Sequence, residues 1–118
     1  MIVRPTAVLI VGHTQCGGAD TSLKVARKEK SLPPGPLGHW LAPLIALAES
    51  LKLQQADPDA LLKVIEANVR AQVTHVADSA PVQAEWQKRE KVWVYGFVYE
   101  LENGKLRDLN VTRSLPPK

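Results

Sequence analysis

Cysteine is almost absent from this chain, which has one, Cys16, among 118 residues. A single cysteine cannot form an internal disulfide, and free thiols are typical of reducing compartments, so we expect a cytoplasmic protein. Long apolar runs are also missing. No segment approaches the roughly 18–20 apolar residues of a membrane-spanning helix, and the apolar run near the start lacks the cleavage site of a signal peptide. The sequence therefore predicts no membrane partner.

The chain also lacks a strong excess of charge of one sign. Its 15 Lys and Arg residues against 12 Asp and Glu residues give a net charge of +3. The basic residues between positions 24 and 30 are interrupted by Glu29 and have no interleaved aromatics, which is typical of a solvated helix face rather than a nucleic-acid surface. Neither a G-x-x-x-x-G-K-[ST] loop nor a G-x-S-x-G turn occurs. Nucleotide-phosphate binding and a serine nucleophile of that kind therefore have no support.

What is present predicts one α/β domain. Hydrophobic residues make up 45% of the chain and charged residues 23%, as in ordinary globular proteins. The run AVLIV at 7–11 predicts a strand buried on both faces, as in parallel sheets. The segments VWVYGFVYEL and GKLRDLNV, which meet at Glu102-Asn103-Gly104, predict a β-hairpin.

Four helices that partly cover the sheet are expected between these strands. The first has Asp20 or Thr21 as its N-cap, the second is largely buried with Pro43 in its first turn, and the third has Asp57 as its cap and Pro58 as its first residue. The predicted helical segments are 19–30, 40–53, 57–79 and 80–88.

The segment LIVGHTQCGGAD, residues 9–20, places the single cysteine three residues after a histidine, between a strand and a helix. Imidazole and thiolate are preferred ligands of Zn²⁺, and His13 and Cys16 can both reach one ion from such a turn. The glycines that follow allow close approach of the backbone. The helix N-terminus behind them supplies amide donors and a positive potential that favour a thiolate or an anion.

The spacing by itself is also compatible with roles other than zinc binding. Two ligands do not make a zinc site, and a cysteine at the end of a strand often only packs. Cys16 as a nucleophile activated by His13 needs both side chains in contact and a third group that orients the imidazole. Asp20 and Thr21 either orient a metal-bound water or cap the helix.

The other histidines and the aromatic residues are expected to be structural. We expect His39 at the surface or at a helix cap, and His75 on the polar side of its helix. The aromatic residues concentrate around the final hairpin without a cofactor motif, which predicts a core or an interface. These are Trp86, Trp93, Tyr95, Phe97 and Tyr99.

The segment VLIVGHTQCGG resembles the second metal motif of the β-class carbonic anhydrases, whose inner strand ends in G-H-x-x-C-G-G. Three further segments resemble that family in the same order. GPLGHWLAPLIALAESL is similar to its segment with a Trp-Leu-x-Pro-Ile core, and EANVRAQVTHVADSAPVQ to its N-V-x-x-Q-V helix. VWVYGFVYELENGKLRDL is similar to its closing hairpin, with Glu100 in place of the usual Asp. The resemblance implies a partial β-carbonic-anhydrase-like sheet, a parallel core strand plus a C-terminal hairpin, flanked by helices.

The same resemblance implies that His13 and Cys16 are zinc ligands, but the family's other site residues have no counterpart here. The C-x-D-x-R motif of the family supplies the first zinc cysteine, an Asp and the Arg that holds it. This chain has one cysteine in total. We therefore expect residues 1–118 to be a single truncated domain that corresponds to the C-terminal half of the family fold.

Two classes of function follow from this resemblance. One is a zinc lyase that hydrates CO₂ to bicarbonate, or acts on a similar small molecule, but is weak or inactive alone. The other is a non-catalytic carbonic-anhydrase-like subunit or a regulatory or assembly protein. A scaffold repurposed for other chemistry in the same pocket is a third alternative.

Loss of half of the fold would expose the edge of AVLIV and the faces of two apolar helices. Such surfaces favour a homo-oligomer, and we expect a dimer. Two copies of HTQC that meet across a two-fold axis would present His₂Cys₂, a complete tetrahedral set for a structural zinc ion.

Overall fold

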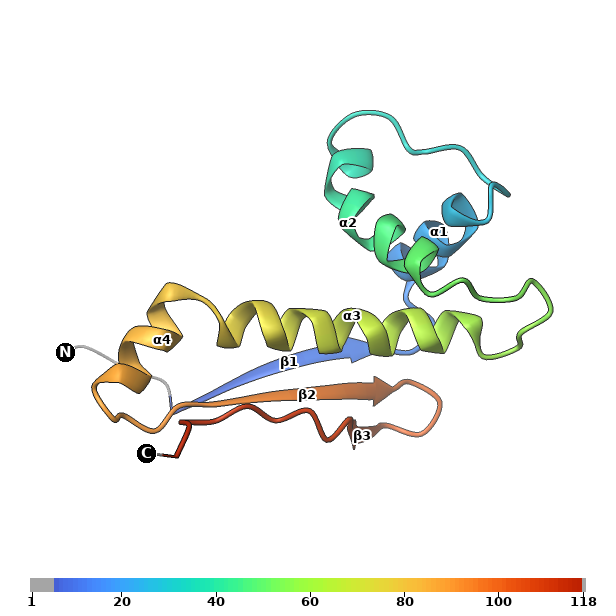
Figure 1. Cartoon of the computed structure of the whole chain (residues 1–118). Coiled ribbons are helices and arrows are strands. Elements are labelled where there is room, and N and C mark those ends of the chain that lie inside the picture. The colour runs from blue at the N-terminus through green and yellow to red at the C-terminus, as the bar shows by residue number, and fades with distance from the viewer. Residues whose placement is uncertain (1–5, 118) are drawn as a thin grey trace.

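A mixed sheet covered on one face by a long helix forms the centre of the molecule (Figure 1). The computed structural model describes residues 6–117. The elements in chain order are β1 (Ala7–His13), α1 (Gly17–Ala26), α2 (Pro36–Ser50), α3 (Ala60–Ala77), α4 (Ala80–Gln87), β2 (Trp93–Glu100) and β3 (Lys105–Asp108). The predicted α/β class, with a parallel strand and a C-terminal hairpin, is confirmed.

The three strands lie in the order β1-β2-β3. β1 and β2 are parallel, with Ala7 beside Trp93 and His13 beside Tyr99. β2 and β3 are antiparallel and form the predicted hairpin. Since β1 is the first strand in this order, its outer edge pairs with no strand among residues 6–117.

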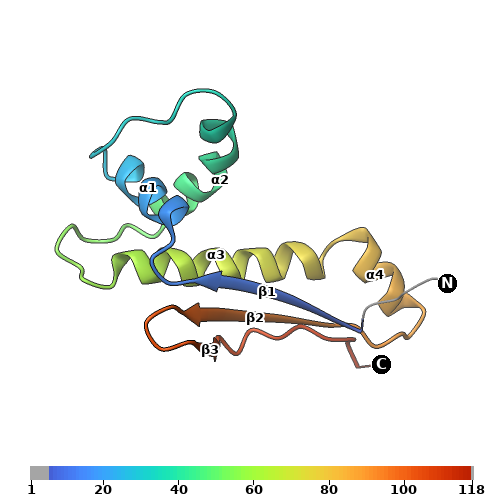
Figure 2. The ribbon, with the colours of Figure 1, turned by 180° about the vertical axis from the view of Figure 1, so that it is seen from behind.

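Helix α3 lies along one face of the sheet, as both views of the ribbon show (Figures 1 and 2). Apolar residues at helical spacing place one side of α3 against the strands. Val94 and Val98 of β2 are completely buried beneath it. The buried residues of the helix are Ala60, Val64, Ile65, Val69, Val73 and Ala77.

The other helices lie around α3. α1 and α2 lie side by side on the side of α3 that is away from β2 and β3, close to the end of β1 (Figures 1 and 2). α4 turns back at the opposite end, where the buried Trp86 donates its indole N–H to the carbonyl oxygen of Val92 at 3.0 Å. No helix in the described part of the chain is long and apolar enough to cross a bilayer.

No helix among residues 6–117 covers the opposite face of the sheet, so the prediction that the AVLIV strand is buried on both faces was wrong. Leu9 is 58% exposed and Val11 is 51% exposed, while their neighbours Val8 and Ile10 point into the core. A continuous apolar run indicates a strand of a parallel sheet. Whether both faces of that strand are buried depends on the layers that surround it.

The start of α1 differs from the prediction. The helix begins at Gly17 with Cys16 as N-cap, so Asp20 and Thr21 do not cap it. The first helical bond runs from the Asp20 N–H to the Cys16 carbonyl at 2.9 Å. The two glycines thus belong to the first turn, and the helix ends at Ala26 rather than continuing to residue 30.

The starts of α2 and α3 were also predicted wrongly. Pro36, not Pro43, lies in the first turn of α2, because a proline at that place loses no helical hydrogen bond. Trp40 is not buried but 78% exposed. α3 begins at Ala60, and the carboxylate of Asp57 instead accepts the N–H of Asp59 just before the helix.

Candidate metal centre

The turn between β1 and α1 carries both predicted metal ligands. His13 is the last residue of β1 and Cys16 is the N-cap of α1, with Thr14 and Gln15 between them. Gln15 has φ of 57°, a left-handed backbone conformation that is uncommon for a residue other than glycine. The two donors are therefore held on one short, sharply turned segment.

His13 is held by a hydrogen bond from its imidazole ring to the next residue. Its Nδ1 lies 2.8 Å from the carbonyl oxygen of Thr14. A carbonyl can only accept, so Nδ1 donates in this bond, and in the tautomer with its proton on Nδ1 the lone pair lies on Nε2. Metal-binding histidines commonly donate their second N–H to a carbonyl in this way. The side chain is exposed at the end of the strand.

Cys16 is a free, half-buried cysteine that packs against the edge of the core. Asp20 and Thr21 lie in the next turn of α1, where the Asp20 carboxylate pairs with Lys24 Nζ at 2.9 Å. This ion pair gives Asp20 a partner other than a metal-bound water.

This turn offers only two side chains of the kinds that bind zinc, His13 and Cys16. His39 lies exposed on α2 and His75 lies exposed on α3. Residues 6–117 contain no group of three or more His, Cys, Asp or Glu side chains that could hold a metal ion. His13 and Cys16 thus fit zinc in chemical kind, but a zinc site needs three or four protein ligands.

The carboxylate of Glu102, a residue that the sequence placed only in the hairpin turn, lies beside Thr14 and Gln15, the two spacer residues between His13 and Cys16. Glu102 accepts the Thr14 hydroxyl on Oε2 at 3.0 Å and the Gln15 side-chain amide on Oε1 at 3.0 Å. No local pattern indicates this contact, since Glu102 is 87 residues from Gln15 in the chain. It follows from the parallel pairing of β1 with β2, which brings the two turns together.

These hydrogen bonds also affect the charge of the carboxyl group. The pKa of Glu102 lies below its ordinary value of 4.5, because its own backbone N–H, the Gln15 amide and the Thr14 hydroxyl donate to the carboxylate. Glu102 is therefore negatively charged at neutral pH.

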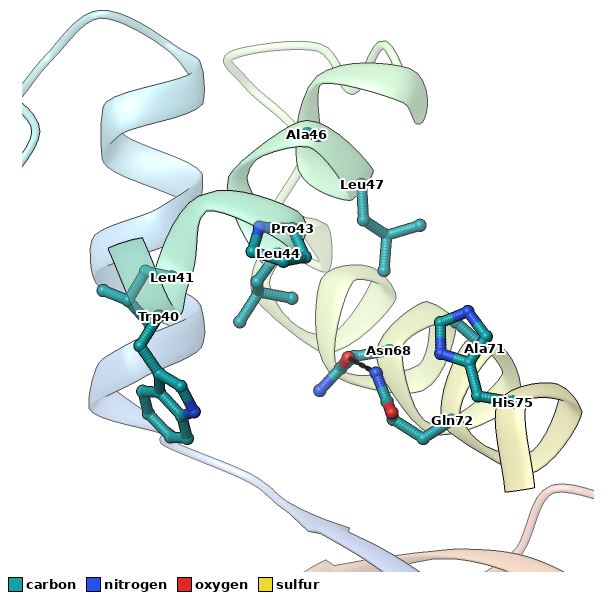
Figure 3. A pocket seen from close by; sticks show the side chains of 10 residues that line it. All are labelled: Trp40, Leu41, Pro43, Leu44, Ala46, Leu47, Asn68, Ala71, Gln72 and His75. Carbon is teal, nitrogen blue, oxygen red and sulfur yellow. Dashed lines mark hydrogen bonds between the residues drawn. The ribbon is translucent and has the colours of Figure 1, made fainter. Parts of the chain in front are cut away.

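A separate apolar groove of about 780 Å³ lies between α2 and α3. Leu44 and Leu47 of α2 line one side (Figure 3). Asn68 and Gln72 of α3, joined by a hydrogen bond of 3.3 Å, line the other side. His75 lies at the same groove, so the structure does not bring it together with His13 and Cys16.

The fold and the turn describe a class of protein: an α/β chain with a parallel strand that ends in a His-x-x-Cys turn. The sequence matches the carbonic anhydrase family over residues 2–106. The chain belongs to the β-class carbonic anhydrase family, as the sequence predicted.

Similar proteins show the same family and a difference in length. The carbonic anhydrase of Emericella nidulans is 26% identical in an alignment 111 positions long, and the match covers 88% of this chain and 45% of that protein. The β-carbonic anhydrase of Coccomyxa, solved in complex with acetazolamide, has a TM-score of 0.76 and 30% identity, and the match covers 87% of this chain and 46% of that one. A tetrameric β-carbonic anhydrase of Sordaria macrospora has a TM-score of 0.76 at 21% identity, with 92% and 54% covered. The chain spans about half the length of the curated relatives it matches.

Proposed function

We propose that this chain supplies part of a β-carbonic-anhydrase zinc site, with His13 and Cys16 as ligands, and that it hydrates CO₂ weakly or not at all by itself. The observation that carries the proposal is the orientation of His13, whose Nδ1–H is taken by the Thr14 carbonyl so that Nε2 is free. Membership of the carbonic anhydrase family supports it.

The expected weak or absent CO₂ hydration follows from the number of zinc ligands that the chain supplies. A catalytic zinc ion lowers the pKa of its bound water to about 7, which supplies hydroxide for attack on CO₂. Such an ion is held by three protein ligands that also orient the water. His13 Nε2 and Cys16 Sγ would provide two of them, so this chain alone would hold zinc loosely and place the water poorly.

A non-catalytic carbonic-anhydrase-like subunit or assembly protein is the second candidate, and the open sheet face favours it. Leu9 and Val11 are exposed on that face. We propose that copies of the chain associate through such surfaces, as a dimer. A two-fold pair that brings two HTQC turns together would share one His₂Cys₂ zinc site. We also propose a cytoplasmic location, which the single unpaired cysteine supports.

Metal content and CO₂ hydration of the purified chain test the proposal together. We expect zinc to bind weakly to the wild type and to be lost in His13→Ala and Cys16→Ser, because each variant removes one of two donors. His39→Ala is the matched control, since His39 is exposed on α2, and it should bind zinc as the wild type does. Stopped-flow hydration should remain near the uncatalysed rate.

Three results would decide between the alternatives. Zinc-dependent hydration as fast as that of a full-length relative would contradict the weak or inactive enzyme. Unchanged zinc binding in both variants would contradict the assignment of the ligands. One zinc per two chains, lost together with the dimer in Cys16→Ser, would identify the shared structural site.

A further inference from the structure

The segment between the two proposed ligands has little regular backbone support of its own. Thr14 extends the strand pairing by one bond, from its N–H to the Tyr99 carbonyl at 3.0 Å. Gln15 then takes a left-handed φ of 57°. For a residue with a side chain this conformation costs about 1 kcal/mol or more and persists only where the surroundings hold it. The turn between His13 and Cys16 therefore needs outside contacts to keep its shape.

Glu102 of the β2–β3 turn supplies those contacts. One carboxylate oxygen accepts from Thr14 and the other accepts from Gln15, each at 3.0 Å. The Thr14 hydroxyl in turn accepts the backbone N–H of Leu101 at 2.9 Å. Both spacer residues of the H-x-x-C segment are thus bonded to one anionic side chain, and Thr14 is also bonded to the backbone of the hairpin.

We propose that Glu102 is a positioning residue that fixes the shape of the His13–Cys16 turn and thereby presents both ligands to one point. Its role toward zinc rests on the function proposed above, whereas its role in ordering the turn does not. Glu102 acts through Thr14 and Gln15 and does not bind the metal itself. Both of its carboxylate oxygens accept these hydrogen bonds, which favours a role in holding the turn over a role as a metal ligand.

Three variants separate this role from a general effect of charge. Glu102→Ala removes both bonds, and Glu102→Gln keeps an acceptor oxygen but loses the charge and the second acceptor. Glu100→Gln is the matched control, because it removes the same charge from the same hairpin. Among the described residues, the Glu100 side chain makes no hydrogen bond or ion pair.

The first measurement uses the metal-free chain. Hydrogen exchange should show the amides of Thr14 and Leu101 exchanging at least about tenfold faster in Glu102→Ala than in the wild type, with Glu102→Gln between them and Glu100→Gln unchanged. Alkylation of Cys16 should also accelerate in Glu102→Ala, because the turn that holds the thiol against the core is released. Equal protection in Glu102→Ala and the wild type would overturn the proposal, whether or not the chain binds zinc.

The second measurement is zinc affinity, by competition with a chelating dye. Loss of a group that orients metal ligands typically weakens binding about 10–100-fold, and we expect that loss in Glu102→Ala and none in Glu100→Gln. A wild type that binds zinc and a Glu102→Ala variant that binds it equally well would overturn the positioning role. A wild type that binds no zinc would overturn the proposed function, and the exchange data would still decide whether Glu102 orders the turn.

Discussion

Two glycines on neighbouring strands determine how closely α3 approaches the sheet. A Cβ atom added at Gly12 of β1 would lie 2.8 Å from Val69 Cγ2 and 3.2 Å from Ile65 Cγ2. One added at Gly96 of β2 would lie 2.8–3.0 Å from side-chain atoms of three valines, among them Val69 and Val73 of α3. Neither glycine needs an unusual backbone angle, so their function is to leave space for the helix.

Substitution of either glycine by alanine should therefore destabilise the fold. Extra methyl groups in a packed core cost about 1–3 kcal/mol, and the removal of a strand glycine returns about 0.5–1 kcal/mol. We expect a net loss of about 1–2 kcal/mol for Gly96→Ala and somewhat less for Gly12→Ala, measured by urea unfolding.

Gly17→Ala is the control for these variants. A Cβ atom at Gly17 would meet nothing within 4 Å, and alanine is a better helix former than glycine. This variant should be as stable as the wild type or more so. Equal stability of Gly96→Ala and Gly17→Ala would show that the contact between α3 and the sheet can relax without cost.

At the scale of elements, the segment before α3 is tied to the helix by an ion pair. The Asp57 carboxylate accepts Lys63 Nζ at 2.6 Å and the Asp59 N–H at 2.8 Å. The bond from Lys63, followed by that from Asp59, lowers the pKa of Asp57 from its ordinary 3.8. The bond to Asp57 raises the pKa of Lys63 above its ordinary 10.5.

These directions predict how the pair contributes to stability as pH changes. Because the pKa of Asp57 is lowered on folding, its contribution is present above about pH 4 and is lost as the pH falls through the folded value. Because the pKa of Lys63 is raised, its contribution is present below about pH 10.4 and is lost as the pH rises through the folded value. The stability difference between the wild type and Asp57→Asn should thus be largest between these limits.

Thermal unfolding followed by circular dichroism at several pH values measures this difference. Glu90→Gln is a charge-matched control, since Glu90 is exposed after α4, and its stability difference should be small throughout. A difference for Asp57→Asn that is the same at about pH 3 and about pH 7 would show that the ion pair does not stabilise the start of α3.

At the scale of the whole molecule, the sheet has one buried face and one open face. The open face carries Leu9 and Val11 of β1. On β2 it carries Trp93, Tyr95 and Phe97, whose rings stack in sequence with centroids 6.4 Å and 5.9 Å apart. The aromatic residues near the hairpin therefore divide between two roles, because Trp86 lies in the core and the stacked rings do not. Apolar faces of this kind favour association.

We expect the purified chain to have the mass of a dimer or larger at micromolar concentration, as measured by light scattering after size exclusion. Leu9→Lys should weaken dimerisation about 10–100-fold, because the burial of a leucine contributes about 1.5–3 kcal/mol. Leu37→Lys is the control: Leu37 is 51% exposed but lies on α2. A monomer of 13.0 kDa, or equal effects of the two variants, would contradict association through the open face.

Local signals along the chain were enough to predict the order and type of the elements, because periodicity and turn residues act over a few positions. The alternation in residues 92–111 and the helical spacing of residues 61–76 need no knowledge of distant segments. The H-x-x-C turn was predictable for the same reason, since His13 and Cys16 are separated by two residues. The four motifs in family order also lie along the chain and identified the family.

Features that depend on residues far apart in the chain were settled by tertiary structure alone. Whether Leu9 is buried depends on which layer covers its face, and AVLIV looks the same whether one face or both are covered. The bond between Gln15 and Glu102 exists because β1 pairs with β2 in parallel, which brings the end of one strand beside the turn that follows the other. Such contacts depend on how the strands are connected and paired, so no pattern of neighbouring residues predicts them.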